Sequence, residues 1–108
     1  MKISLCSVPV ENTDRLRRKR SEGPTPIAPK YAITSLNHWA EKNGFATCKF
    51  YDVDMLCPSD EEVEKYFRDN ETDVVGLSAI VSTSYMQVKR LARIIKKENK
   101  KTLIVCGG

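Results

Sequence analysis

The chain has 108 residues, of which 41% are hydrophobic and 30% charged, and its formal net charge is +4. This composition is typical of one folded domain and excludes a disordered or fibrous protein. No apolar run approaches the length of a membrane span, and the N-terminus lacks the sections of a signal peptide, so we expect a cytoplasmic protein.

The positive charge is concentrated in one short segment. Five basic side chains lie in the run RLRRKR, and without them the chain would have 13 basic residues against 14 acidic ones. The remainder lacks the spread of positive charge that nucleic-acid-binding surfaces show. We therefore favour a solvated loop over a nucleic-acid partner, with a phosphate or nucleic-acid contact as the alternative. The five residues are Arg15, Arg17, Arg18, Lys19 and Arg20.

The first elements are a strand, a loop and a helix. Residues 2–8 alternate weakly and predict a strand, which Pro9 ends. Residues 9–29 form a long basic loop, of a length that is usually functional or mobile. A helix follows from about Pro29 to the left-handed C-cap Gly44. Its expected buried face consists of Ala32, Leu36, Trp39 and Ala40, with Ile33 on the flank.

A second strand and a second helix come next. The alternating residues 47–53, TCKFYDV, predict the strand. Ser59 and Glu62 form a capping box, in which the serine bonds a first-turn amide and the glutamate reaches back. The second helix should therefore begin after Ser59 and run to about Asp69.

The stretch of residues 73–84, DVVGLSAIVSTS, organises the rest of the chain. It begins as a dense apolar strand of the kind found in parallel sheets covered on both faces. It ends in hydroxyl side chains, of which Ser82, Thr83 or Ser84 should cap a third helix. That helix carries Val88, Leu91, Ala92 and Ile95 on one face, and residues 102–106, TLIVC, then predict a fourth strand.

The alternation of strands and helices predicts an α/β fold. The sheet should be parallel with right-handed crossovers and strand order 2-1-3-4, which is a flavodoxin-like, Rossmann-like three-layer α/β/α arrangement. Residues 1–108 would form a single domain, the N-terminal part of a longer protein, because a strand ending in Gly-Gly normally leads into a further helix. The fourth strand would then be an exposed edge that could pair with a neighbour.

The cysteines and the histidine do not predict a metal site. Cys6, Cys48, Cys57 and Cys106 are too widely spaced for a zinc site or a redox pair, and core thiols are favoured, with Cys57 placed in a loop. A whole strand should separate Cys6 from Cys106, which argues against a disulfide. The only histidine, His38, is expected to be an ordinary residue of the first helix.

The loops exclude several common ligands of such folds. The segment SVPVENTD after the first strand has no glycine, so it contains neither a dinucleotide-binding G-x-G-x-x-G nor a P-loop. The third strand does not end in the aspartate of a phosphoacceptor domain. What remains is a site of hydroxyl side chains after the third strand and a diglycine after the fourth. Glycine permits close approach, so a large flat or heterocyclic group could lie against this edge.

The segments GLSAIVSTS and LIVCGG resemble those of the cobalamin-binding domain family. The resemblance implies that hydroxyl side chains and the diglycine surround the nucleotide tail of the cofactor. It assigns Ser78 and Ser82 to the two hydroxyl positions, Ile80 to the apolar position between them, and Gly107 and Gly108 to the diglycine.

The segments PIAPKYAITSLNHWAEKNG and FYDVD resemble one subset of this family, the N-terminal domain of cobalamin-dependent radical S-adenosylmethionine (radical SAM) enzymes. The resemblance implies a module that holds cobalamin for methyl transfer, or related radical chemistry, by a downstream radical SAM domain. S-adenosylmethionine and a 4Fe-4S cluster would bind only in that domain, because the chain lacks the motif C-x-x-x-C-x-x-C. No catalytic residue is assigned to the segment itself.

One departure from other cobalamin domains concerns the cobalt ligand. Methionine synthases and mutases carry D-x-H-x-x-G after the first strand, whose histidine coordinates cobalt, whereas residues 9–29 contain no histidine. We therefore expect cobalamin to bind without such a ligand. The alternative is a cofactor-less docking or assembly module of the same ancestry, which the missing histidine and the basic loop also fit.

Overall fold

The computed structural model describes residues 1–9, 31–44, 47–79 and 84–107. Its four described strands form one parallel sheet in the order β2-β1-β3-β4, which confirms the predicted topology and the flavodoxin-like α/β fold. The strands are β1 (Lys2–Ser7), β2 (Thr47–Tyr51), β3 (Val74–Ser78) and β4 (Leu103–Gly107).

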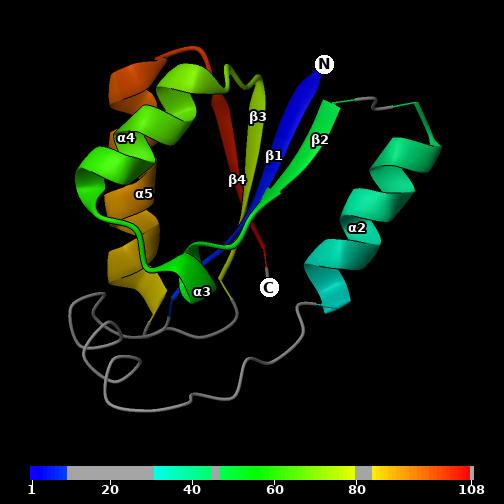
Figure 1. Ribbon diagram of the computed structural model, residues 1–108, viewed down its shortest axis with the longest axis horizontal. Coiled ribbons are helices and arrows are strands. Elements are labelled where there is room, and N and C mark those ends of the chain that lie inside the picture. Colours follow the sequence, from blue (N-terminus) through cyan, green and yellow to red (C-terminus); the bar gives the residue numbers. More distant parts are fainter. Residues whose placement is uncertain (10–30, 45–46, 80–83, 108) are drawn as a thin grey trace.

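The helices cover the two faces of the sheet unequally. In Figure 1, α4 and α5 lie together on one face, α2 lies alone on the other, and the short α3 lies near the carboxyl ends of the strands. No helix within the described residues is long and apolar enough to cross a membrane. The helices are α2 (Tyr31–Lys42), α3 (Val53–Leu56), α4 (Asp60–Asp69) and α5 (Tyr85–Glu98).

The hydrophobic core lies between the sheet and the pair α4 and α5. Val75 and Leu77 of β3 are 0% and 2% exposed, and Leu91 of α5 is 1% exposed. They belong to one buried cluster that joins both helices to the sheet. The cluster consists of Cys6, Val8, Tyr51, Val53, Val63, Phe67, Val75, Leu77, Leu91, Ile94 and Ile95.

The predicted capping box holds the start of α4. The Glu62 amide donates to Ser59 Oγ at 3.2 Å, and the Ser59 amide donates to Glu62 Oε1 at 3.4 Å. These bonds satisfy two amides that the first turn of a helix cannot pair internally. The boundary of α4 was therefore readable from four residues.

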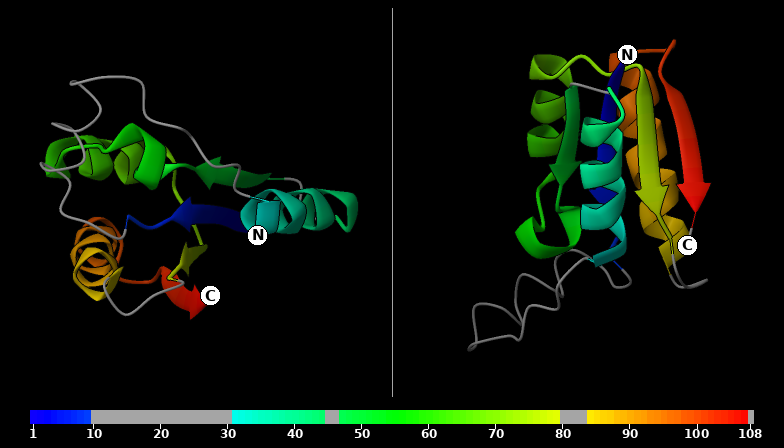
Figure 2. Two further views of the ribbon diagram at one scale, coloured as in Figure 1. Left: turned by 90° about the horizontal axis from the view of Figure 1, so that it is seen from below. Right: turned by 90° about the vertical axis from the view of Figure 1, so that its right-hand side faces the viewer.

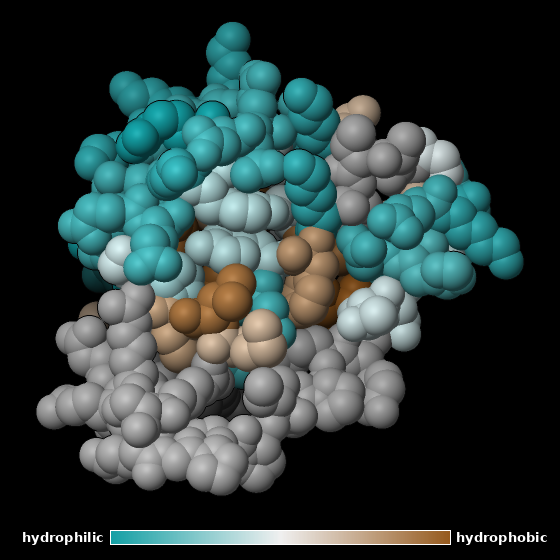
Figure 3. Space-filling view, viewed as in Figure 1, coloured by the Kyte–Doolittle hydropathy of each residue, from teal (hydrophilic) through white to brown (hydrophobic). Residues whose placement is uncertain are grey.

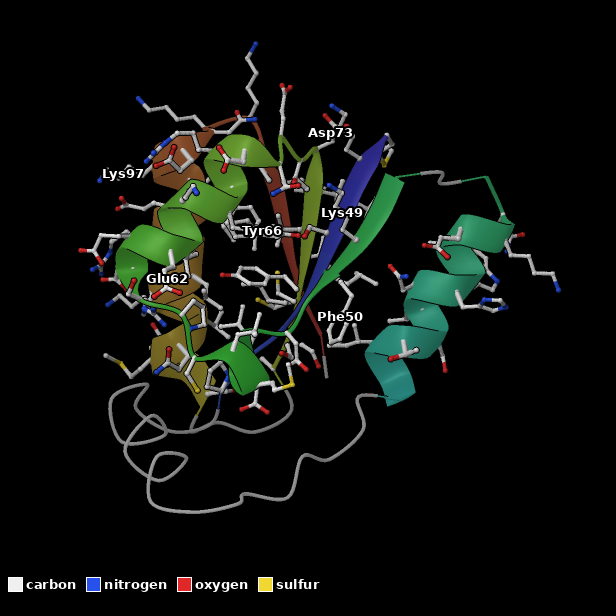
Figure 4. The ribbon with its side chains drawn as sticks, in the orientation of Figure 1. Lys49, Phe50, Glu62, Tyr66, Asp73 and Lys97 are labelled. Carbon is white, nitrogen blue, oxygen red and sulfur yellow. The ribbon has the colours of Figure 1, made fainter. Side chains whose placement is uncertain are left out.

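Aromatic side chains connect α4 to the sheet. Tyr66 reaches from α4 towards the strands (Figure 4), stacks on Tyr51 with a centroid distance of 3.9 Å, and meets Phe67 edge-on at 5.0 Å. The Tyr66 hydroxyl lies 3.3 Å from Ser4 Oγ of β1. A polar contact therefore accompanies the buried rings, as burial of a tyrosine requires.

The predicted buried face of α2 is partly wrong. Ile33 and Ala40 are buried, at 6% and 8% exposed, whereas Leu36 and Trp39 are 57% and 59% exposed. The physical reason is that α2 packs mainly against β1 and β2, so a stripe narrower than the periodic pattern meets the sheet. Gly44 after α2 has φ +93, which confirms its left-handed C-cap conformation.

Two predictions around the strand ends also need correction. The second strand ends at Tyr51 rather than Val53, because Asp52 caps α3 and Val53 turns into the core at 0% exposed. Cys57 lies in the connection between α3 and α4, as predicted, and is buried at 2% exposed. Cys106 is an exposed thiol rather than a core one, since β4 is an edge of the described sheet.

Candidate functional site

The carboxyl ends of β3 and β4 meet where the sequence predicts a site. Ser78 and Gly107 are register partners, and the Ala79 amide donates to the Gly107 carbonyl at 2.7 Å. The structure thus brings together one predicted hydroxyl residue and one residue of the diglycine. The other predicted site residues, Ile80, Ser82 and Gly108, lie outside the described residues.

A groove of about 450 Å³ runs from this edge along the face of the sheet that carries α2. In the right-hand view of Figure 2, α2 stands in front of β1, while no described helix stands in front of β3 and β4. The volume of the groove lies within the range of small-molecule binding sites. The side chains and backbone that line it are from Ile3, Leu5, Cys6, Ile33, Leu36, Val74, Gly76, Leu77, Ser78, Val105 and Gly107.

The alternation of strand residues explains why the groove is apolar. Val75 and Leu77 point into the core, so the intervening Val74, Gly76 and Ser78 face the groove and are half-buried. Val105 of β4 is 50% exposed on this side. A sequence pattern typical of a strand covered on both faces therefore leaves an apolar wall open beside α2.

The two glycines keep the groove open. A Cβ at Gly76 would lie 2.9 Å from Leu5 Cδ2, so even alanine would displace a side chain in the floor. A Cβ at Gly107 would meet no atom within 4 Å, and hence would extend into open space at the mouth. The groove can therefore admit a flat group close to the backbone of β3 and β4.

The other half of the carboxyl edge is closed by α3. The Ser7 hydroxyl donates to Asp52 Oδ1 at 2.7 Å and accepts a bond of 3.1 Å from the Asp54 amide. Asp52 Oδ1 also accepts from the Met55 amide at 3.2 Å. These groups serve the turn between β2 and α3. Sequence reasoning missed α3, although Asp52 three residues before Met55 is an N-cap signal.

Apolar surface surrounds this closed half of the edge. Figure 3 shows the hydrophobic residues gathered near α3, between the hydrophilic surfaces of α4 and of the outer side of α2. Leu56 of α3 is 57% exposed, and Tyr85 and Met86 at the start of α5 are 64% and 67% exposed. Ser84 is the N-cap residue of α5, but its side chain makes no capping hydrogen bond.

Cys6 is the cysteine among the described residues that lines the groove. Burial raises the pKa of the Cys6 thiol from 9.0 to about 12, so it stays protonated and is a poor nucleophile near neutral pH. His38 is exposed on α2. Within the part of the chain that the structure describes, no three His, Cys, Asp or Glu residues gather as a metal site.

The family comparison matches this arrangement. The family model described as "B12 binding domain" matches residues 24–108, a span that includes α2, the groove-lining strands β3 and β4, and all five residues assigned to the cofactor. No curated protein and no solved structure matches the chain.

Proposed function

Because the chain belongs to the family of B12 binding domains, we propose that the groove beside α2 holds the nucleotide tail of cobalamin. The observation that carries this proposal is the open apolar groove that ends at Ser78 and Gly107. Gly76 also supports the proposal. Its lack of a side chain keeps the floor of the groove free, and a Cβ there would lie only 2.9 Å from Leu5 Cδ2.

Different residues of the groove would contact different parts of the nucleotide tail. The apolar walls would enclose the base of the tail, and Ser78 at the mouth would offer a hydroxyl to its polar part. Gly107 would let the backbone of β4 approach closely. Ile80, Ser82 and Gly108 remain proposed contacts on the resemblance alone. When bound, cobalamin supplies the group-transfer or radical chemistry, while the protein supplies binding and orientation.

We further propose that this module serves a radical SAM domain downstream of it. The domain would use S-adenosylmethionine and a 4Fe-4S cluster to transfer a methyl group to unreactive carbon, or to perform a related rearrangement. The support is the similarity of residues 26–44 and 50–54 to that subset, together with the absence of histidine from residues 9–29. A full-length protein that methylates only with cobalamin and S-adenosylmethionine together would support this assignment.

The first test is retention of cobalamin by the purified chain. Hydroxocobalamin is added, excess is removed by desalting, and bound cofactor is measured by visible absorbance. We expect the parent chain to retain colour and Gly107→Leu to lose it, because a Cβ at Gly107 enters open space at the mouth of the groove and the leucine side chain would occupy that space. The double variant Ser78→Tyr, Ser82→Tyr should lose it as well.

Cys106→Leu is the matched control for Gly107→Leu. It places the same side chain one residue away, at an exposed position next to the groove-lining pair Val105 and Gly107 but not itself in the groove. This variant should keep the colour. No colour in a parent chain shown to be folded would instead favour the cofactor-less docking module.

A further inference from the structure

The polar and apolar parts of the groove are separated along its length. Its polar lining among the described residues is at the mouth, where Ser78 and Gly107 end their strands. Further in, the walls are alkyl side chains. These are Ile3, Leu5, Ile33, Leu36, Val74 and Val105.

The backbone of the floor offers no further partners. The amides and carbonyls of β1 and β3 are engaged in parallel ladders, β1 with β2 and β3, and β3 with β1 and β4. Cys6 and Leu77 touch the groove, but both belong to the core cluster under α4 and α5. A group that lies over β1 and β3 in the depth of the groove therefore meets hydrocarbon from the described residues.

This separation bears on which corrinoid fits. Corrinoids share one ring and differ in the base of the nucleotide tail. A dimethylbenzimidazole presents methyl groups and hydrocarbon edges, whereas a purine such as adenine adds ring nitrogens and an amino group. In the depth of the groove those polar atoms would lose water without gaining hydrogen bonds from the described residues, which is unfavourable.

We propose that this groove selects corrinoids by their lower base, and takes an alkylated benzimidazole in preference to a purine. The proposal rests on the proposed function, since it assumes that the tail lies in the groove. Leaving one buried polar group unpaired weakens binding by about tenfold or more. We therefore expect cobalamin to bind at least about tenfold more tightly than adeninylcobamide.

The test is a comparison of three corrinoids on the full chain. Dissociation constants are measured by visible absorbance for cobalamin, adeninylcobamide and cobinamide, which lacks the nucleotide tail. We expect cobalamin to bind most tightly, and both adeninylcobamide and cobinamide to bind more weakly. Equal affinity for cobalamin and adeninylcobamide would overturn base selection and leave the proposed function standing. Binding of none of the three by the folded chain would remove both.

A pair of variants links the preference to the groove wall. Leu36→Gln places an amide on the α2 wall, keeps a good helix former, and should narrow the ratio of the two dissociation constants several-fold. Leu103→Gln is the matched control, because Leu103 is 58% exposed against 57% for Leu36 and does not line the groove. It should leave the ratio unchanged. An equal effect of both variants would contradict selection by this groove.

Discussion

Alternate residues of the same strands point to the two faces of the sheet and have different roles there. Under α4 and α5, Val75 and Leu77 are at most 2% exposed and belong to a continuous core. On the face of α2, Val74 and Gly76 line an open groove, and Leu103 and Val105 of β4 are at least 50% exposed. The face under α4 and α5, called the closed face below, thus supplies stability. The face of α2, called the open face, leaves room for a ligand.

The closed face is also held by polar contacts at its rim. Arg90 of α5 pairs with Asp60 of α4 at 2.5 Å and donates to the Pro58 carbonyl at 2.8 Å. Lys97, labelled in Figure 4, pairs with Glu64 at 3.1 Å. One partner of each pair is more than 60% exposed, and surface ion pairs of this kind contribute little stability individually.

The largest expected effect comes from a cavity on the closed face. Leu91→Ala removes a side chain that is 1% exposed in the core, and should lower the free energy of unfolding by about 2–5 kcal/mol. Leu36→Ala on the open face removes the same atoms from a side chain that is 57% exposed, and should cost less than about 1 kcal/mol. Urea unfolding measures both. Similar costs would contradict the division between the faces.

The next largest effect is expected at alkaline pH, which should lower the free energy of unfolding through a buried tyrosine of the closed face. Burial raises the pKa of Tyr51 from 10.0 to about 12. The unfolded chain therefore releases this proton first, so the stability is complete below pH 10.0 and is lost as pH rises towards 12. The loss attributable to Tyr51 is on the order of 2 kcal/mol. The buried Cys6 thiol adds a loss of the same sign, starting from its ordinary pKa of 9.0.

Tyr51→Phe isolates the tyrosine part of this pH dependence. The variant keeps a ring to stack on Tyr66 but has no proton to lose, so its unfolding free energy should fall less steeply above pH 10.0. Urea unfolding at a series of pH values measures the slope. Tyr85→Phe, at a position that is 64% exposed, should retain the parent slope. An unchanged slope in Tyr51→Phe would exclude the buried hydroxyl as the cause.

A smaller effect is expected from the cap of α4. Ser59→Ala removes the side-chain acceptor of the Glu62 amide and should cost about 1 kcal/mol of unfolding free energy. Ser35→Ala, at an exposed position inside α2, should be neutral or slightly stabilising, because alanine is the better helix former. Urea unfolding compares the two. A Ser59→Ala chain as stable as the parent would mean that packing alone fixes the start of α4.

The closed face was more predictable from sequence than the open one. Strand order follows from the alternation of strands and helices, and the start of α4 from the local bonds of Ser59 and Glu62. The exposure of Leu36 and Trp39 was not predictable, because helical periodicity cannot show how much of a sheet face a helix covers. That depends on tertiary packing between distant segments.

The candidate site was predicted in its position rather than in its shape. Ser78 and Gly107 lie together because the carboxyl ends of adjacent parallel strands meet at one edge. The groove was missed, since its lining from Ile3 to Val105 reads as ordinary core sequence. The signal that could have indicated it is Gly76, because a glycine inside a strand often marks a close approach.

Gly76→Ala should change the free energy of unfolding less than the variants above, but should clearly weaken cobalamin binding. The added Cβ would lie 2.9 Å from Leu5 Cδ2, which is the end of a flexible side chain beside an open groove. Alanine is also better than glycine inside a strand by about 0.5–1 kcal/mol, which offsets part of that strain. The unfolding free energy should therefore stay within about 1 kcal/mol of the parent. The methyl group and the displaced Leu5 would both occupy the floor, so cobalamin should bind about tenfold more weakly or worse.

The adjacent residue of β3 should behave in the opposite way. Val75→Ala removes buried atoms from the closed face, where Val75 is 0% exposed, so it should lower the unfolding free energy by about 1–3 kcal/mol. Cobalamin affinity should change little while the chain remains folded, because Val75 does not line the groove. Absorbance titration and urea unfolding of both variants measure the two effects. If Gly76→Ala binds cobalamin as the parent does, the tail does not lie on this floor. If Val75→Ala loses affinity equally, the two faces are not independent.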